Sequence, residues 1–161
     1  MTVHSKDPDW LQKKILANLK KTYCRIGRSR VSGVGVIAIR DIPKNTNPFP
    51  EPVPAHWTRI PKKDIDRLDP VIRKMVYDFY AAETNGDMEL SEFALNGLNV
   101  SYFLNQSRRP NLQRTRNGNF RTIRRIAKGK ELFTRYADFD CRYMPEKHGK
   151  RNPIKPEKPR Y

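Results

Sequence analysis

Glycine and serine break the β-branched residues of the first third of the chain into short groups, and this spacing constrains the fold most. The clearest example is Val31-Ser32-Gly33-Val34-Gly35-Val36-Ile37-Ala38-Ile39, which is soon followed by Asp41-Ile42-Pro43-Lys44-Asn45. Val and Ile favour strands, whereas Gly, Ser, Asn and Pro at such short intervals favour turns. The region therefore predicts several short strands joined by tight turns.

The second half of the chain repeats this pattern. Residues 120–126 and 131–136 are strand-like, and a turn at Lys128-Gly129-Lys130 separates them. Asn85-Gly86-Asp87 is a further turn, and its position before Met88-Glu89-Leu90 predicts a short hairpin. Small sheets built from short strands are thus expected from both halves of the chain.

Two segments predict helices instead. Asp7-Pro8 and Asp69-Pro70 each combine a residue that caps free backbone amides with a proline suited to the first helical turn. Apolar residues at helical spacing follow each pair, as far as about Lys21 in the first case and over about 70–82 in the second. The chain is therefore expected to be α+β and mainly β, with one N-terminal helix and one helix in mid-chain.

Two proline-rich segments lack the pattern of a helix or a strand. Residues 47–61 contain five prolines, and each proline fixes φ and removes a backbone donor, so we expect an extended, irregular segment. Residues 145–161 contain six Lys or Arg against Glu146 and Glu157, a net charge of +4. This composition predicts a basic, flexible tail with no core of its own.

The charge of the chain constrains its partners. Its 161 residues suit a single domain, and 33 Lys and Arg against 17 Asp and Glu give a net charge of +16. Such an excess either forms a solvated surface or favours nucleic acid and nucleoprotein as partners. Seven arginines lie between positions 108 and 125, with no acidic residue among them. We expect a weak nucleic-acid-binding patch that contains Arg114, Arg116, Arg121, Arg124 and Arg125.

Cysteine and histidine do not form a metal-binding pattern. Cys24 and Cys141 are too few for a disulfide framework or a four-cysteine zinc site, and the three histidines are scattered. Residues 81–92 match several positions of a calcium-binding EF-hand loop, but Ala81 stands where the first carboxylate is needed. We therefore expect no metal. No segment has the length of a membrane span or the apolar core of a signal peptide, which predicts a soluble, intracellular protein without a membrane partner.

Three segments, taken in order, carry a resemblance to a known family. Residues 31–42 resemble the opening GxGVFA signature of the SET methyltransferase family. The run Phe103-Leu104-Asn105-Gln106-Ser107-Arg108-Arg109-Pro110-Asn111 is similar to the central NHSxxPN signature, and residues 126–136 look like the closing "I..GEEL...Y". One Gly-x-Gly alone is weak evidence, whereas the central and closing motifs in this order are specific.

This resemblance implies a domain organisation and a fold. The SET domain would cover residues 23–143, with a variable insert at about 47–95, an N-terminal helical extension over 1–22 and the tail over 144–161. The SET-type fold consists of small, curled sheets with one inserted helix here, and its chain end threads under the central motif as in a pseudoknot. Asn45 stands where the family has a glycine in an early turn, and asparagine also tolerates the left-handed backbone conformation.

The resemblance also implies a reaction. Family members transfer a methyl group from S-adenosyl-L-methionine to a lysine of a protein substrate. The residues that the resemblance assigns to cofactor binding are Gly33, Val34, Gly35, Asn105, Gln106 and Tyr136. Tyr136 is also the implied catalytic residue. Its hydroxyl and several backbone carbonyls would together orient the methyl group and the attacking amine.

The chemistry of this reaction fits the residues present. A lysine amine is nucleophilic only when neutral, and its ordinary pKa is about 10.4. Desolvation and a nearby positive charge both lower that pKa. A strong general base is then unnecessary, in keeping with a chain that has no well-placed histidine.

A second hypothesis comes from departures within the motifs. Gln106 stands where the family usually has histidine, and Arg135 stands where an acidic or small residue is common. Taken singly, Gly33 and Gly35 would suit a plain hairpin, and Tyr136 would suit a core. The first hypothesis is a protein-lysine methyltransferase with histone as the first substrate class and ribosomal protein as the second. The alternative is a catalytically weak or inactive SET-fold module that binds nucleic acid or nucleoprotein through its arginines.

Overall fold

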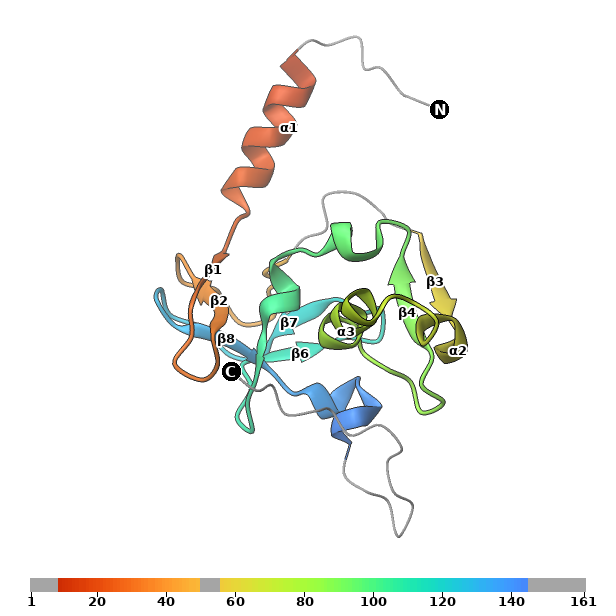
Figure 1. Cartoon of the computed structure of the whole chain (residues 1–161). Coiled ribbons are helices and arrows are strands. Elements are labelled where there is room, and N and C mark those ends of the chain that lie inside the picture. The colour runs from red at the N-terminus through yellow and green to blue at the C-terminus, as the bar shows by residue number, and fades with distance from the viewer. Residues whose placement is uncertain (1–8, 50–55, 145–161) are drawn as a thin grey trace.

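The computed structural model describes residues 9–49 and 56–144, and its central element is a four-stranded sheet with the strand order β1-β2-β8-β5 (Figure 1). The strands are β1 (Cys24–Arg28), β2 (Val34–Ala38), β8 (Glu131–Thr134) and β5 (Asn105–Gln106). β1 and β2 form an antiparallel hairpin in which Gly27 lies opposite Gly35. The short strands expected from the grouped Val and Ile residues are therefore present.

Strand β8 comes late in the chain but lies between two earlier strands. It pairs antiparallel with β2, where Leu132 lies opposite Val36, and parallel with β5. Asn111 adds a further connection, because its Oδ1 accepts from the Phe133 amide at 2.7 Å and its Nδ2 donates to the Glu131 carbonyl at 2.9 Å. Strand β8 is thus bonded to the 105–111 segment along its length, which confirms the pseudoknot-like arrangement of the late chain and the central motif.

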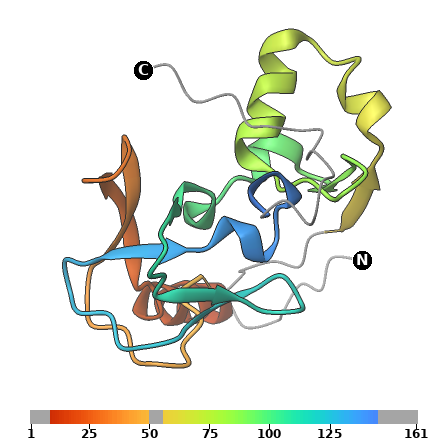
Figure 2. The same ribbon diagram turned by 90° about the horizontal axis from the view of Figure 1, so that it is seen from below.

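The mid-chain insert forms its own small unit on the other side of the molecule (Figures 1 and 2). It contains β3 (Trp57–Ile60), α2 (Lys62–Ile65), α3 (Pro70–Phe79) and β4 (Met88–Ser91), and β3 pairs antiparallel with β4. Helix α3 begins as expected, because Asp69 accepts hydrogen bonds from the amides of Val71 at 2.8 Å and Ile72 at 3.4 Å. The predicted inserted helix is therefore confirmed.

Short elements connect the sheet and the insert. A second hairpin pairs β6 (Leu112–Arg114) with β7 (Phe120–Thr122). The described residues also contain four 3-10 turns: two between β4 and β5, at Ala94–Gly97 and Val100–Phe103, and two after β8, at Tyr136–Asp138 and Cys141–Tyr143. Together these elements confirm an α+β chain in which short strands predominate.

Two hydrophobic clusters hold the elements together. The first lies at the central sheet and contains Cys24, Val36, Ala38, Ile42, Leu104, Leu112, Ile126 and Leu132. The second lies in the insert and contains Ile65, Val76, Tyr80, Ala82, Met88 and Cys141. Since Cys141 follows the last strand, the second cluster ties the segment after β8 to the insert.

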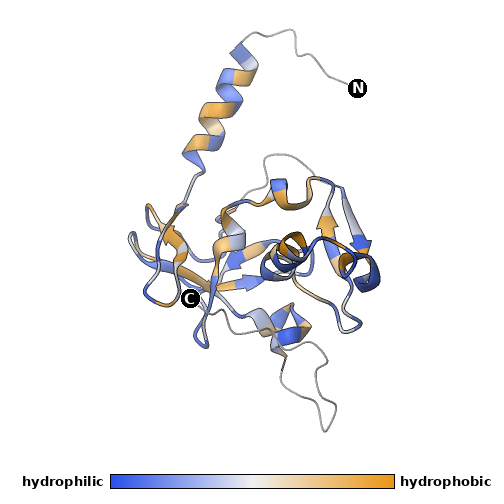
Figure 3. Ribbon diagram, viewed as in Figure 1, coloured by the Kyte–Doolittle hydropathy of each residue, from blue (hydrophilic) through white to orange (hydrophobic). Residues whose placement is uncertain are grey.

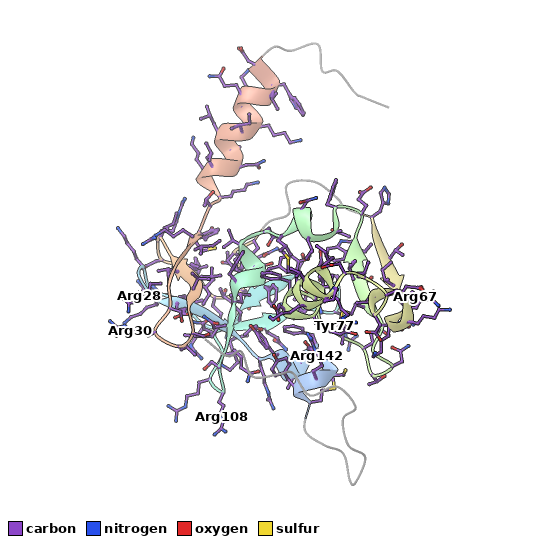
Figure 4. All side chains as sticks on the ribbon, viewed as in Figure 1. Arg28, Arg30, Arg67, Tyr77, Arg108 and Arg142 are labelled. Carbon is purple, nitrogen blue, oxygen red and sulfur yellow. The ribbon has the colours of Figure 1, made fainter. Side chains whose placement is uncertain are left out.

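A buried ion pair strengthens this tie. The Arg142 and Asp140 side chains are only 7% and 5% exposed, and their charged groups meet at 2.7 Å. The Arg142 guanidinium also donates to the carbonyls of Tyr77 at 2.6 Å and Tyr80 at 2.8 Å, so it reaches the end of α3 (Figure 4). Buried charges need such partners because desolvation penalises an unpaired charge heavily.

Helix α1 (Asp9–Lys20) confirms the expected N-terminal helix and projects away from the rest of the protein (Figure 1). None of its residues is buried, and hydrophobic residues remain exposed along it (Figure 3). The clearest of these are Leu11, Ile15 and Leu19, at spacings of four residues. Its end is tied to the body where Arg40 donates to the Lys20 carbonyl at 2.9 Å.

Three local predictions need correction. The helix expected over 70–82 ends at Phe79, because Tyr80 turns extended and its side chain packs into the core at 3% exposure. The hairpin expected at residues 85–90 is reduced to one bridge between Ala82 and Met88, since β4 pairs along its length with β3 instead. The segment 47–61 is not irregular throughout, because Trp57–Ile60, which has no proline, forms β3.

Other predictions have different outcomes. Asn45 adopts φ +64°, which confirms its left-handed conformation. The basic tail at 145–161, the prolines within 50–55 and the Asp7-Pro8 cap lie outside the described residues. The proposed boundaries at residues 22, 47, 95 and 143 remain predictions.

Candidate active site

A tight turn between β1 and β2 forms one side of the site. Its first residue, Ser29, accepts hydrogen bonds through Oγ from the amides of Val31 at 2.9 Å and Ser32 at 3.2 Å. Gly33 completes the turn with φ +46°, and no atom lies within 4 Å of the position that a Cβ would take there. Glycine at this position therefore serves the backbone conformation, and it leaves open space beside the turn.

Asn105 reaches this turn from β5. Its Nδ2 donates to the Val34 carbonyl at 2.9 Å, to the Ser32 carbonyl at 3.4 Å and to Oε1 of Glu131 at 2.9 Å. These bonds occupy the donor end of the amide, so Oδ1 is the atom that remains to accept a hydrogen bond from a ligand. The structure thus brings Asn105 together with the predicted turn, 71 residues earlier in the chain at Val34.

Gly35 has a different reason to be glycine. A Cβ at this position would lie 2.2 Å from Oε1 of Glu131 and 3.0 Å from Nδ2 of Asn105. The resemblance to the SET family assigned this glycine to cofactor binding. In the structure, the space beside Gly35 is filled by the Glu131 carboxylate, so the glycine makes room for that side chain.

Tyr136 forms the other side of the site. Its hydroxyl donates to the carbonyl of Leu104 at 2.5 Å, immediately before Asn105 in the chain. Burial, with smaller contributions from Tyr143 and Asp140, raises the pKa of Tyr136 to about 12. The hydroxyl therefore stays protonated at neutral pH and acts as a hydrogen-bond donor.

A row of contacts between aromatic rings begins at Tyr136. Tyr143 packs edge-on against it with ring centroids 5.0 Å apart, and Phe139 lies 6.0 Å away on another side. Phe139 in turn contacts Phe120, which contacts Phe49. Phe49, the aromatic nearest to the opening motif in sequence, thus belongs to the far end of this row rather than to the surroundings of Tyr136.

The two residues that depart from the family pattern are both exposed. Gln106 is exposed and pairs through its backbone, opposite Thr134 in the parallel ladder of β5 and β8. Arg135 is also exposed and forms a 3.7 Å ion pair with Asp138. Position 106 can therefore keep its backbone role whether glutamine or histidine occupies it.

The arginines of the predicted nucleic-acid patch divide into two groups. Arg114 is half-buried, donates to the Gly118 carbonyl at 3.2 Å and stacks over Phe139 at 5.1 Å. Arg125 is held by Asp41, and Arg124 donates to the Arg109 carbonyl at 3.0 Å. Arg124 and Arg125 are nevertheless exposed, as are Arg116 and Arg121 on the β6–β7 hairpin. Arg114 alone of these five arginines is half-buried, so the other four remain accessible to a ligand.

Other cations surround the candidate site. Arg28 and Arg30 flank Ser29 of the turn, and Figure 4 shows them pointing outward on the same side as Arg108. An open hollow of about 450 Å³ lies beside Glu131 and Phe133. Its rim carries Arg109, Arg124, Arg125 and Lys130. The surroundings of the site therefore favour anionic groups.

Sequence reasoning missed three residues of the site, namely Ser29, Glu131 and Tyr143. Ser29 precedes the recognised glycine motif by four residues, and its spacing before Gly33 is typical of a serine that caps a turn. Glu131 lies within the closing motif and gave a signal only as part of that motif. Tyr143 follows the motifs, and its contact with Tyr136 depends on the path of the chain end.

The part of the chain that the structure describes contains neither a metal-binding cluster nor a membrane-spanning helix. Within residues 9–49 and 56–144, no three His, Cys, Asp or Glu side chains are grouped to hold a metal ion. None of the helices in those ranges has the length and apolar character needed to cross a membrane.

Comparison with known proteins defines the class of this protein. The family model described as SET domain matches residues 33–137, well over half of the chain, and the matched segment contains every residue predicted to bind cofactor or act in catalysis. The chain belongs to the SET domain family. No curated protein matches its sequence significantly.

Two solved structures resemble the fold. A candidate histone methyltransferase of Plasmodium falciparum aligns with a TM-score of 0.44 and 19% identity, over 71% of this chain and 93% of that one. A humanized mutant of the Chaetomium thermophilum Polycomb Repressive Complex 2, bound to the inhibitor GSK126, aligns with a TM-score of 0.45 and 20% identity. That alignment covers 72% of this chain and 15% of the Chaetomium chain.

Proposed function

We propose that this protein transfers a methyl group from S-adenosyl-L-methionine to a lysine of another protein, as SET domain proteins do. One observation carries the proposal. The consecutive residues Leu104 and Asn105 connect the hydroxyl of Tyr136 to the turn that contains Gly33. The residues proposed for catalysis and for cofactor binding are therefore held in one continuous hydrogen-bonded unit.

The residues of this unit fit the chemistry of the cofactor. S-adenosyl-L-methionine supplies an electrophilic methyl group on a positively charged sulfur, and it carries an ammonium and a carboxylate at one end. Oδ1 of Asn105 can accept from an ammonium, and the open space at Gly33 admits a ligand beside the turn. Arg28 and Arg30 can offset the carboxylate, since both are exposed beside that turn. We assign Val34 and Gln106 to the same site through their backbones.

Tyr136 has the properties that the proposed reaction needs. Because burial keeps its hydroxyl neutral and the single proton is donated to Leu104, the oxygen can accept from an uncharged amine without adding a charge to the site. The rings of Tyr143 and Phe139 pack against the ring of Tyr136 and make its surroundings apolar. Loss of water from a lysine side chain favours its neutral, nucleophilic form. Holding that amine in line supplies much of the remaining rate enhancement.

Charge is segregated in a way that suits a basic protein substrate. Residues 56–99, around the insert, contain eight Asp and Glu against six Lys and Arg, whereas residues 100–144 contain three against eleven. Glu83, Asp87, Glu89 and Glu92 form the acidic run of the insert. A lysine-rich segment would be attracted to the insert and repelled by the rest, which supports histone or ribosomal protein as the substrate class.

The proposal is tested by methyl transfer itself. The protein is incubated with radiolabelled S-adenosyl-L-methionine and, separately, with core histones, nucleosomes, ribosomal proteins and free lysine-containing peptides. We expect labelled bands among the basic proteins and none when Tyr136→Phe protein is used. Calorimetry with S-adenosyl-L-methionine and its demethylated product is the companion measurement. A folded protein that binds neither compound is not a methyltransferase.

A second function is favoured by the exposed arginines. Arg116 and Arg121 extend from the β6–β7 hairpin without an acidic residue nearby in the sequence. They suit sequence-independent contacts to phosphate groups, with affinity that falls steeply as salt rises. If the protein binds nucleic acid but not the cofactor, its function is that of a SET-fold binding module without catalytic activity.

A further inference from the structure

The carboxylate of Glu131 lies at the centre of the hydrogen-bond network behind the turn. It accepts from the Ser29 hydroxyl, at 2.9 Å through Oε1 and 3.1 Å through Oε2, and from Nδ2 of Asn105 at 2.9 Å. Ser29 comes from the end of the first hairpin strand and Asn105 from β5, so the carboxylate joins segments 76 residues apart in the sequence. Glu131 itself is half-buried in β8.

Both partners of Glu131 hold the same turn, but from opposite ends. Ser29 accepts from the amides of Val31 and Ser32, at the beginning of the turn. Asn105 donates to the carbonyls of Ser32 and Val34, at its end. Because Ser29 gives its only proton to Glu131, its oxygen lone pairs face the turn amides. The carboxylate thus fixes the orientation of both side chains that shape the turn.

We propose that Glu131 is the positioning residue of the cofactor site, and that it acts through Ser29 and Asn105 without touching the substrate. This inference rests on the proposed function, because it assigns the turn to cofactor binding. The carboxylate makes Nδ2 of Asn105 point inward, and Oδ1 is thereby presented to the ammonium of the cofactor. Glycine at position 35 is the structural consequence, since any Cβ would occupy the place of Oε1.

The network requires, at position 131, a group that accepts hydrogen bonds and donates none. Both groups that meet Glu131 donate hydrogen bonds, and an ionised carboxylate accepts several at once. A glutamine at position 131 has the same size but carries an NH2 group, which must face one of the two donors or turn away. Glu131→Gln is therefore a test of orientation that leaves volume and packing almost unchanged.

The test measures affinity for S-adenosyl-L-methionine and for its demethylated product by calorimetry. We expect Glu131→Gln to weaken both by about ten- to a hundredfold, the range expected for losing hydrogen bonds to a charged group. Ser29→Ala removes one arm of the network and should weaken binding by about two- to tenfold. Asp64→Asn, which removes a carboxylate from the exposed surface of α2, is the matched control and should bind as the wild type does.

Two further readouts distinguish positioning from a general loss of stability. In methyl-transfer assays with a saturating peptide, Glu131→Gln should raise the KM for cofactor while kcat at saturating cofactor changes by less than about threefold. In the free protein, the amides of Val31 and Ser32 should exchange with solvent faster in Glu131→Gln, as measured by NMR. Amides of the insert strands should exchange at the wild-type rate.

The possible outcomes are distinct. Wild-type affinity in Glu131→Gln, or a KM for cofactor that does not change, overturns the inference and leaves the proposed function standing. A fall in kcat with no change in cofactor affinity also overturns it. If the wild-type protein binds neither compound, the proposed function fails and the assignment of Glu131 fails with it.

Discussion

The hydroxyl of Tyr136 and the carbonyl of Leu104 form a 2.5 Å hydrogen bond that joins the last motif of the chain to the central one. Leu104 is 3% exposed and belongs to the core of the main sheet, so the acceptor is held rigidly. The next residue, Asn105, contacts the turn at Val34. The position of the proposed catalytic hydroxyl is therefore fixed relative to the cofactor turn by a single peptide unit.

Tyr136→Phe should lower turnover by about a hundredfold or more, because one oriented hydrogen bond in a water-excluded site contributes a few kcal/mol to transition-state stabilisation. The ring contacts with Tyr143 and Phe139 should survive the change. Steady-state kinetics and calorimetry check this, since cofactor affinity should stay within about threefold of the wild type. Turnover equal to that of the wild type would remove Tyr136 from the mechanism.

Gly35→Ala should weaken cofactor binding because the new Cβ displaces the Glu131 carboxylate. The effect should depend on the identity of residue 131, since the clash distance of 2.2 Å is to Oε1. In a Glu131→Ala background we expect little further loss from Gly35→Ala, and a double-mutant cycle by calorimetry measures this coupling. Equal losses in both backgrounds would show that the glycine approaches the cofactor directly, without involvement of Glu131.

Gly33 is required by the backbone of the turn, whereas Gly35 makes room for Glu131, and the sequence alone does not distinguish these two reasons. The β-branched groups predicted the strands of the main sheet, and the Asp69-Pro70 cap with its apolar repeat predicted the inserted helix. The resemblance assigned Asn105 and the turn to one site. Glu131 and Ser29 are 102 residues apart, and their contact depends on β8 lying beside β2. No local pattern reports such a contact. The length of α3 was missed for a similar reason, because burial of Tyr80 overrides its place in a helical repeat.

Stability should decline at alkaline pH because two buried groups hold their protons more tightly in the folded state. Burial raises the pKa of the Cys24 thiol to about 11 from 9.0, and that of Tyr136 to about 12 from 10.0. A raised pKa means that the unfolded state loses the proton first, so the contribution is complete below the unfolded pKa and is lost as pH rises. The Cys24 contribution thus falls between about pH 9 and 11, and that of Tyr136 between about pH 10 and 12.

Urea unfolding at a series of pH values from 8 to about 11.5 checks this expectation. Cys24→Ala should flatten the decline in the lower window, and Tyr136→Phe should flatten it in the upper one. Burial also raises the pKa of Tyr143, so some decline should remain in both variants. A free energy of unfolding with the same pH slope in wild type and variants would contradict the assignment of these groups.

Arg142→Ala should destabilise the protein by about 3–5 kcal/mol, the usual cost of removing one partner of a buried ion pair. The change leaves the Asp140 carboxylate buried without its charge partner and frees the carbonyls of Tyr77 and Tyr80. Chemical unfolding measures the difference. The control is Arg67→Ala, which breaks an exposed pair with Asp64 and should cost less than about 1 kcal/mol. Equal costs would mean that the C-terminal segment is not held to the insert through Arg142.

On the β6–β7 hairpin, the exposed Arg116 and Arg121 should behave differently from the half-buried Arg114. Changing Arg116 and Arg121 to Ala should weaken binding to double-stranded DNA and reduce the slope of log affinity against log salt by about 2, because each contact to a phosphate releases counterions. These changes should leave stability unaltered, since both side chains are exposed. Arg114→Ala should instead lower stability, because it removes the stack on Phe139 and the bond to Gly118. Fluorescence anisotropy at several salt concentrations, with unfolding curves for each variant, separates the two effects.

If the exposed pair Arg116 and Arg121 serves to recruit nucleoprotein, its loss should lower methylation of nucleosomes and leave methylation of a short free peptide unchanged. Equal loss on both substrates would place these arginines in the formation of the catalytic site instead.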